Sequence, residues 1–218
     1  MLKKFVLKQS KSEIEKASIE TSVRNKIGLM FYNGQGVVKD YETAVEFFKL
    51  SAEKGDADAQ YNLGFMYRIG DGVLQDYKTA FKWYTLAADQ DHAEAQASLG
   101  VMYRKGQGVV QDYKTAVKWY TLSAKQGYAH AQYNLGVMYA KGQGVKENYK
   151  TAVKWLTLSA EQGNAEAQFY LGGMYYNGLG VVRDYKTAFK WYTLSAEQGN
   201  AHAQHMIGYM YYNGEGVE

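Results

Sequence analysis

The sequence of 218 residues contains no cysteine and no proline. Without cysteine the chain can form no disulfide bond, no thiolate metal site and no cysteine nucleophile. It also has no run approaching the roughly 18 apolar residues that a membrane-spanning helix requires. Its basic opening holds only the short apolar run 5–7, so no signal-peptide pattern is visible. A cytoplasmic location and an exported or envelope-associated one both stay open.

Charge of one sign is also scarce, since 25 basic and 22 acidic residues leave a formal net charge of +3. So small an excess does not imply an acidic partner. Hydrophobic residues make up 46% of the chain and aromatic residues 15%, which is too apolar for a disordered chain. The composition indicates a folded protein with ample material for a core.

An internal repeat organises the sequence, with glycines recurring every 36 residues. The six positions are Gly28, Gly64, Gly100, Gly136, Gly172 and Gly208. Within one unit, residues 59–67 and 77–88 each place their apolar side chains at helical spacing. Asp76 directly precedes the second segment and is a candidate N-cap. We call the two expected helices of each unit helix A and helix B.

Other glycines stand where these helices should end. Gly70 and Gly72 follow helix A, and both suit a left-handed C-cap and a tight turn. Gly55, Gly127, Gly163 and Gly199 follow helix B, and Asp91 takes the same position once. The sequence therefore predicts that every 36-residue unit is a helical hairpin.

Small residues explain the glycine within helix A. Gly64 faces helix B alanines such as Ala80 and Ala87, which would allow the two helix axes to approach closely. A single hairpin cannot bury the aromatic side chains of its own repeat, so the units must stack. The aromatic residues expected in this repeat core are Trp83, Trp119, Trp155, Trp191, Tyr67, Tyr103, Tyr139 and Tyr175.

The stretches "AQYNLGVMYAKGQGV" and "NYKTAVKWLTLSAEQGNAEAQ" resemble the Sel-one-like repeat, a relative of the tetratricopeptide repeat. The resemblance runs from about Val23 to Val217. It implies an all-α fold, a right-handed α/α superhelical solenoid that serves as an interaction scaffold. Repeat one departs from the pattern at Val23 and Arg24, and the disulfides of cysteine-rich members cannot form here.

The expected domain organisation is an N-terminal segment, 1–21, followed by a solenoid over 22–218 with five full repeats and a sixth helix A. Ser12 and Glu15 form a capping box, which predicts a helix that caps the first repeat. At the other end Ile207, Met210 and Tyr211 would lack a covering helix B. Two explanations stay open: the natural chain continues with further repeats, or two chains pair end to end as a homodimer.

Motifs for chemistry are weak. The G-x-G loops follow a helix rather than a strand and lack a Gly-Lys-Ser/Thr sequence, which argues against a phosphate-binding loop. His202 and His205 have a chelating spacing, but no third ligand lies nearby in the sequence. The segment 92–94 matches half of a deaminase signature whose cysteine half is missing. We therefore expect no catalytic residue, no cofactor and no metal, and a protein that is not an enzyme.

The residues that vary between repeats lie opposite the core stripe of helix A, and we expect them to bind a peptide or a partner protein in a concave groove. Asn62 and Asn134 match the position where related peptide-binding repeats place an asparagine clamp. An alternative is that many of these side chains only pack between successive A helices. The candidate partner-binding residues are Tyr61, Asn62, Phe65, Arg68, Arg104, Tyr133, Asn134, Phe169, Tyr176, His205, Tyr209 and Tyr212.

Two other functions remain as alternatives. Exposed tyrosines could stack on the sugars of an envelope glycan. A ridge of helix B lysines could instead bind nucleic acid or another anionic surface, although a solvated outer face is the plainer interpretation. The ridge consists of Lys78, Lys82, Lys114, Lys118, Lys150, Lys154, Lys186 and Lys190.

Overall fold

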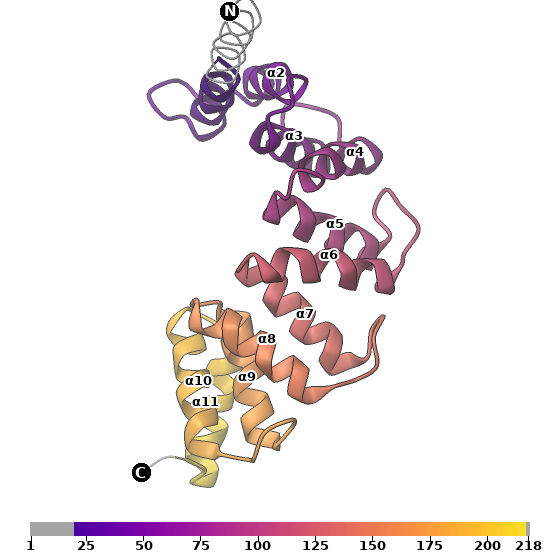
Figure 1. Ribbon diagram of the computed structural model, residues 1–218. Coiled ribbons are helices and arrows are strands. Elements are labelled where there is room, and N and C mark those ends of the chain that lie inside the picture. Colours follow the sequence, from indigo (N-terminus) through magenta and orange to yellow (C-terminus); the bar gives the residue numbers. More distant parts are fainter. Residues whose placement is uncertain (1–19, 217–218) are drawn as a thin grey trace, which may run out of the picture. The chain divides into compact units, whose positions relative to one another are not determined.

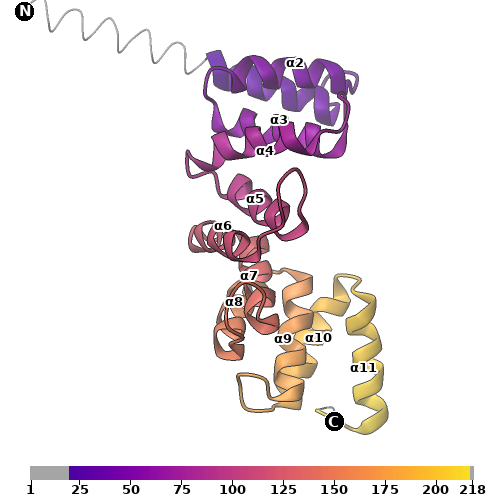
Figure 2. The same ribbon diagram turned by 90° about the vertical axis from the view of Figure 1, so that its right-hand side faces the viewer.

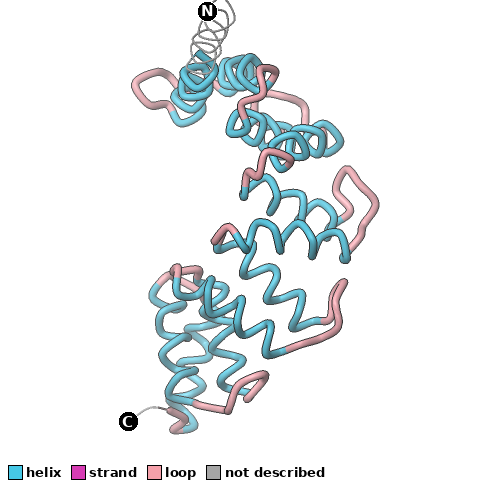
Figure 3. Tube along the Cα trace, in the orientation of Figure 1, coloured by secondary structure: helices cyan, strands magenta, loops and turns pink. Residues whose placement is uncertain are grey.

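The computed structural model describes residues 20–216, and every regular element in that range is a helix (Figures 1 and 3). Residues 20–33 are helical. The following helices are α2 (Tyr41–Ala52), α3 (Ala57–Ile69), α4 (Tyr77–Ala88), α5 (Ala93–Lys105), α6 (Tyr113–Lys125), α7 (Ala129–Lys141), α8 (Tyr149–Glu161), α9 (Ala165–Asn177), α10 (Tyr185–Glu197) and α11 (Ala201–Asn213). The all-α class is confirmed. The capping helix expected around Ser12 lies outside the described residues.

The helix boundaries follow from capping side chains and glycines. Helix α3 begins where the Asp56 carboxylate accepts a hydrogen bond from the Ala59 N–H at 2.7 Å. It ends at Gly70, whose φ of +85° is the left-handed conformation that favours glycine. Helix α4 begins in the same way, since Asp76 accepts from the Lys78 N–H at 2.9 Å. The predicted hairpin of helix A and helix B is confirmed.

The glycine within helix A lies against helix B of the same hairpin. A Cβ added to Gly64 would lie 2.8 Å from Cδ1 of Tyr84 and 3.3 Å from the carbonyl oxygen of Ala80. Gly136 has the same surroundings, with Cγ of Leu156 only 2.7 Å from its added Cβ. Any side chain here would force the two helices apart. Close packing therefore explains the recurring glycine.

The aromatic residue of helix B that is fully buried is a tyrosine, not the tryptophan that the sequence pattern predicts. Tyr84 and Tyr120 are fully buried, whereas the tryptophans that precede them, Trp83 and Trp119, are half-buried. The tyrosine occupies the core because its ring lies on the helix A glycine, and the tryptophan lies beside that contact. All eight aromatics expected in the repeat core are half-buried: Trp83, Trp119, Trp155, Trp191, Tyr67, Tyr103, Tyr139 and Tyr175.

From the second repeat onward, the second glycine of the G-x-G loop contacts the preceding repeat. Gly108 has a φ of +72°, and a Cβ added to it would lie 2.5 Å from the carbonyl oxygen of Tyr77. Tyr77 is the first residue of α4, which is helix B of the repeat before. Gly144 and Gly180 approach Tyr113 and Tyr149 in the same way. This loop glycine thus joins successive repeats through backbone contact.

The chain divides into two compact units. The first holds the described residues up to Met102 together with Gly106–Val110, and its core includes Phe48, Leu63 and Met66. The second holds Tyr103–Lys105 and the described residues from Gln111 onward. Within this second unit α9, α10 and α11 lie side by side (Figure 2). Each unit is built from the same stacked hairpins.

The end of the second unit differs from the prediction at one residue. Met210 was expected to be uncovered, but it is fully buried in a cluster with Tyr192 and Ala203. It points toward helix α10 of the preceding hairpin. Tyr211 is 60% exposed and Ile207 is half-buried. The uncovered surface of α11 is therefore smaller than the sequence pattern predicts.

Candidate functional site

The candidate residues of α3 are half-buried and contact neighbouring repeats. The Tyr61 ring stacks on the His92 imidazole with centroids 4.9 Å apart and tilts against Tyr84 at 5.7 Å. The Asn62 amide nitrogen donates to Oδ1 of Asn25 at 3.0 Å. Asn62 is thus held by the preceding helix A through its amide nitrogen.

Phe65 and Arg68 continue this surface. The Phe65 ring meets Tyr32 edge to face at 6.3 Å, and the Arg68 guanidinium lies 5.1 Å from the centre of the Phe65 ring. Arg68 also donates from Nε to the Tyr84 hydroxyl at 3.3 Å. Burial raises the pKa of Tyr84 to about 12, so the phenol stays neutral and can accept this bond. Phe65 and Arg68 are therefore both in contact with other side chains of the same chain.

A small pocket opens between helix 20–33 and α3. Its volume is about 170 Å³. The lining residues are Leu29, Tyr32, Phe48, Tyr61, Asn62, Phe65 and Met66. An apolar cavity of about 150 Å³ is large enough to hold a benzene molecule. This pocket can therefore take one apolar side chain, with Asn62 at its rim as a polar group.

The second unit carries the next candidates on α5 and α7. Arg104 is half-buried, and its charge lies close to Tyr120. The Tyr133 ring meets Tyr170 edge to face at 5.7 Å, and burial raises the pKa of Tyr133. The Asn134 amide donates to the carbonyl oxygen of His130, one turn earlier in its own helix, at 2.8 Å.

The remaining candidates lie on α9 and α11. Phe169 tilts against Tyr192 at 5.7 Å. The Tyr176 hydroxyl donates to the Glu215 carboxylate at 2.7 Å, and this hydrogen bond raises the pKa of Tyr176. Tyr212 is 89% exposed, and His205 and Tyr209 are exposed as well. The candidate residues are therefore half-buried on α3, α7 and α9 and exposed to solvent on α11.

A second pocket, of about 490 Å³, lies at the ends of the helices in the second unit. It is larger than the pocket beside α3 and is called the larger pocket below. It contains two candidates, Tyr133 and Asn134. The full lining is Ala129, His130, Tyr133, Asn134, Gln162, Gly163, Asn164, Ala165, Glu166 and Gln198. A volume of this size is within the usual range for ligand pockets.

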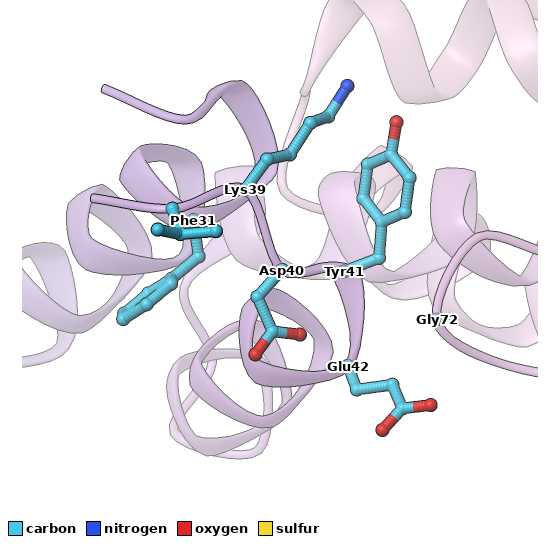
Figure 4. A pocket seen from close by; sticks show the side chains of 7 residues that line it. Phe31, Lys39, Asp40, Tyr41, Glu42 and Gly72 are labelled. Atoms are coloured by element: carbon cyan, nitrogen blue, oxygen red, sulfur yellow. The ribbon is translucent and has the colours of Figure 1, made fainter. Parts of the chain in front are cut away.

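A third pocket, of about 520 Å³, lies beside the first loop (Figure 4). Lys39 and Tyr41 line it side by side, with the ammonium 4.7 Å from the centre of the ring. Asp40 points away from this pair and accepts hydrogen bonds from the Thr43 N–H and hydroxyl. Asp40 therefore serves as the N-cap of α2, and the Lys39 ammonium is held by the tyrosine ring.

The histidine pair and the lysine ridge that the sequence singles out lie on α11 and on the B helices. Within 20–216 no group of three or more His, Cys, Asp or Glu side chains could hold a metal ion. His202 contacts the Phe169 ring at 5.9 Å, and His205 is exposed on the same helix. Over this range each helix is also too short or too polar to span a bilayer. The lysines of the helix B ridge are all exposed.

The sequence did not single out the polar residues at the helix ends. Gln162, Asn164 and Glu166 line the larger pocket, and His92 stacks on Tyr61 in the first unit. Comparison of the repeats offers a signal, because position 92 and position 164 are equivalent and hold different residues. Their roles depend on side-chain geometry, which the repeat pattern does not give.

Similarity to known proteins agrees with this architecture. The Sel1 repeat model matches residues 24–56, 57–92, 93–128, 129–164, 165–200 and 201–218. The chain belongs to the Sel1 repeat family. Sel1 repeat proteins generally mediate protein–protein interactions, and the scaffold is generally non-catalytic. The predicted family and the helical solenoid class are both confirmed.

Two solved Sel1 repeat structures are similar over most of the chain. One is a protective antigen of uropathogenic Escherichia coli, with 41% identity and a TM-score of 0.83 over 89% of this chain. The chain spans only 42% of the length of that protein. The other is a Sel1 repeat protein from Oxalobacter formigenes, with 36% identity, a TM-score of 0.84, and coverage of 91% of this chain and 79% of that one.

A more distant structure shares the fold alone. It is an immunity protein from Pseudomonas aeruginosa, with 24% identity and a TM-score of 0.56, covering 84% of this chain and 68% of that one. Among curated proteins, none matches the chain significantly. The comparisons therefore give the family and the scaffold, and the site must be argued from the residues.

Proposed function

We propose that this Sel1 repeat protein is a non-enzymatic scaffold that binds a peptide or a segment of a partner protein on the face of its A helices that lies opposite the core stripe. The observation that carries the proposal is the pocket of about 170 Å³ between helix 20–33 and α3. It is apolar within and has Asn62 at its rim. A partner would insert one apolar side chain there, and the free Oδ1 of Asn62 would accept a hydrogen bond from the partner backbone.

The fixed geometry of the surrounding side chains supports this proposal. Tyr61 is held by His92, and Arg68 is held by Tyr84. Binding would therefore order few side chains of the scaffold, which lowers the entropic cost of association. Aromatic side chains and arginine are also the residues that most often dominate binding energy at protein interfaces.

The test uses peptides selected from a random displayed library against the purified chain. Leu29→Trp fills the pocket without removing any of the contacts described above. We expect it to weaken the selected peptide by about tenfold or more, measured by fluorescence anisotropy. Leu86→Trp is the matched control, because Leu86 is 47% exposed on helix B, and it should leave the affinity unchanged.

Two results would contradict the proposal. One is an unchanged affinity for the Leu29→Trp protein when its thermal unfolding matches that of the wild type. The other is a steep loss of binding with added salt, because phosphate-like contacts through the lysine ridge depend strongly on ionic strength. A shallow dependence on salt is expected for an apolar pocket.

A further inference from the structure

The glutamine side chains beside the larger pocket have a fixed orientation. The Gln132 nitrogen donates to the carbonyl oxygen of Ala124 at 3.2 Å, which leaves Oε1 of Gln132 as an acceptor. The Gln162 nitrogen donates to that oxygen at 2.7 Å and to the carbonyl of Leu158 at 3.2 Å. Because backbone carbonyls only accept, the amide cannot be flipped. Oε1 of Gln162 therefore remains available as an acceptor on the pocket lining.

Other oxygens of the lining are available in the same way. The Gln198 side-chain nitrogen donates a hydrogen bond to Oε1 of Gln168 at 2.8 Å. The Gln198 side-chain oxygen can therefore accept a hydrogen bond from a ligand. The Asn134 side-chain nitrogen donates to the carbonyl oxygen of His130 in its own helix. Glu166 accepts from Asn200 through one oxygen at 3.3 Å and keeps the other. Among the described lining residues Glu166 alone carries a formal charge, so the pocket offers acceptors and one negative charge.

The first unit contains the equivalent site with an occupant. Residues Tyr61, Gln90, His92 and Glu94 correspond, 72 positions earlier, to Tyr133, Gln162, Asn164 and Glu166. There the His92 imidazole stacks on Tyr61 at 4.9 Å. Its Nδ1 lies 3.3 Å from the Ala95 nitrogen and 3.4 Å from Oε2 of Glu94, and its Nε2 lies 3.2 Å from Oδ1 of Asp58. A planar ring with an N–H donor thus fills this position in the chain itself.

In the second unit Asn164 replaces that histidine. Its Oδ1 accepts from the Ala167 N–H at 2.9 Å, and its nitrogen lies 3.3 Å from Nδ1 of His130. Asparagine therefore performs the capping role of His92 without supplying a ring to stack on Tyr133. The pocket of about 490 Å³ occupies this region. Tyr133, Gln162 and Glu166 retain the aromatic ring and two acceptor side chains of the first unit, whereas His130 stands at the position equivalent to Asp58.

We propose that this pocket binds an arginine side chain of a partner protein. The guanidinium would stack on Tyr133, as His92 stacks on Tyr61, and donate to the Glu166 carboxylate and to Oε1 of Gln162. Arginine fits better than lysine because its planar group carries five donors and stacks on aromatic rings. An anionic group is disfavoured by the negative charge of Glu166. The inference rests on the proposed function, since it names one side chain of the protein partner.

An NMR titration with acetyl-Ala-Arg-Ala-amide tests the pocket directly. We expect shifts at the Tyr133 ring and the Gln162 side-chain amide, and binding about tenfold weaker for the uncharged citrulline peptide. Glu166→Gln should weaken binding about tenfold as well. Asn164→His should do the same, because the new imidazole would fill the pocket. Glu94→Gln, the matched change at the filled site, should leave the affinity unchanged.

Equal binding of the citrulline peptide would overturn the inference. So would binding that survives both Glu166→Gln and Asn164→His, shifts confined to other residues, or preferential binding of a glutamate peptide or an oligosaccharide. If the arginine peptide does not bind while Leu29→Trp still weakens the library-selected peptide, this inference fails and the proposed function stands. If the arginine peptide binds and Leu29→Trp has no effect on the library-selected peptide, the arginine pocket stands and the proposed pocket beside α3 fails.

Discussion

At the scale of single residues, the helix A glycine shows how packing outweighs helix propensity. Alanine would stabilise the helix itself by up to about 1 kcal/mol. At Gly64, however, the added Cβ would meet the Tyr84 ring at 2.8 Å, and that ring is fully buried. At Gly208 nothing lies within 4 Å of the added Cβ.

Gly64→Ala and Gly208→Ala therefore form a matched pair. We expect Gly64→Ala to lower the free energy of unfolding by about 1–3 kcal/mol, because overpacking displaces Tyr84. Gly208→Ala should raise it by up to about 1 kcal/mol. Urea unfolding followed by circular dichroism measures both. A stabilised Gly64→Ala protein would contradict the packing explanation.

A second prediction concerns Tyr192, whose pKa burial raises from 10.0 to about 12. The neutral phenol stabilises the fold fully below pH 10, and this contribution is lost as the pH rises toward 12. Tyr192→Phe cannot ionise, so its stability relative to the wild type should grow by about 1–1.5 kcal/mol between pH 9 and pH 11. Tyr212→Phe, at a side chain 89% exposed, should show no such gain. Urea unfolding at pH 9, 10 and 11 distinguishes them.

At the scale of the elements, the second loop glycine links neighbouring hairpins. Gly108 and Gly127 both have positive φ, at +72° and +92°. Only Gly108 approaches another backbone, since its added Cβ would lie 2.5 Å from the Tyr77 carbonyl oxygen. Gly127→Ala should cost about 1–2 kcal/mol through backbone strain alone. Gly108→Ala should cost more, and equal losses in urea unfolding would contradict the proposed link between repeats.

The repeat sequence could predict the hairpins because caps, turns and apolar spacing recur at fixed positions. It could not separate Trp83 from Tyr84, since adjacent helix B residues both lie on the apolar stripe. It placed Met210 at an uncovered surface because the contribution of α10 to its burial depends on three-dimensional packing. The larger pocket was missed for a related reason: its space depends on Asn164 being shorter than the equivalent His92.

At the scale of the whole molecule, the chain joins an invariant frame to a variable surface. The helix A glycine and the loop glycines repeat in every hairpin, and the buried alanines in nearly all, whereas the open positions of the A helices differ between repeats. A repeat scaffold can therefore change its ligand without changing its fold. In each unit the helix B lysines are exposed to solvent, and the candidate pockets involve the A helices and the helix ends.

Hydrogen exchange of the chain with and without a library-selected peptide tests the central claim most directly. Amides in helix 20–33 and α3 should gain protection when the peptide binds, because the partner would cover the pocket between them. The lysine-bearing helices α4, α6, α8 and α10 should remain unchanged. Protection confined to those lysine-bearing helices, with none on helix 20–33 or α3, would contradict the assignment of the A helices as the binding face.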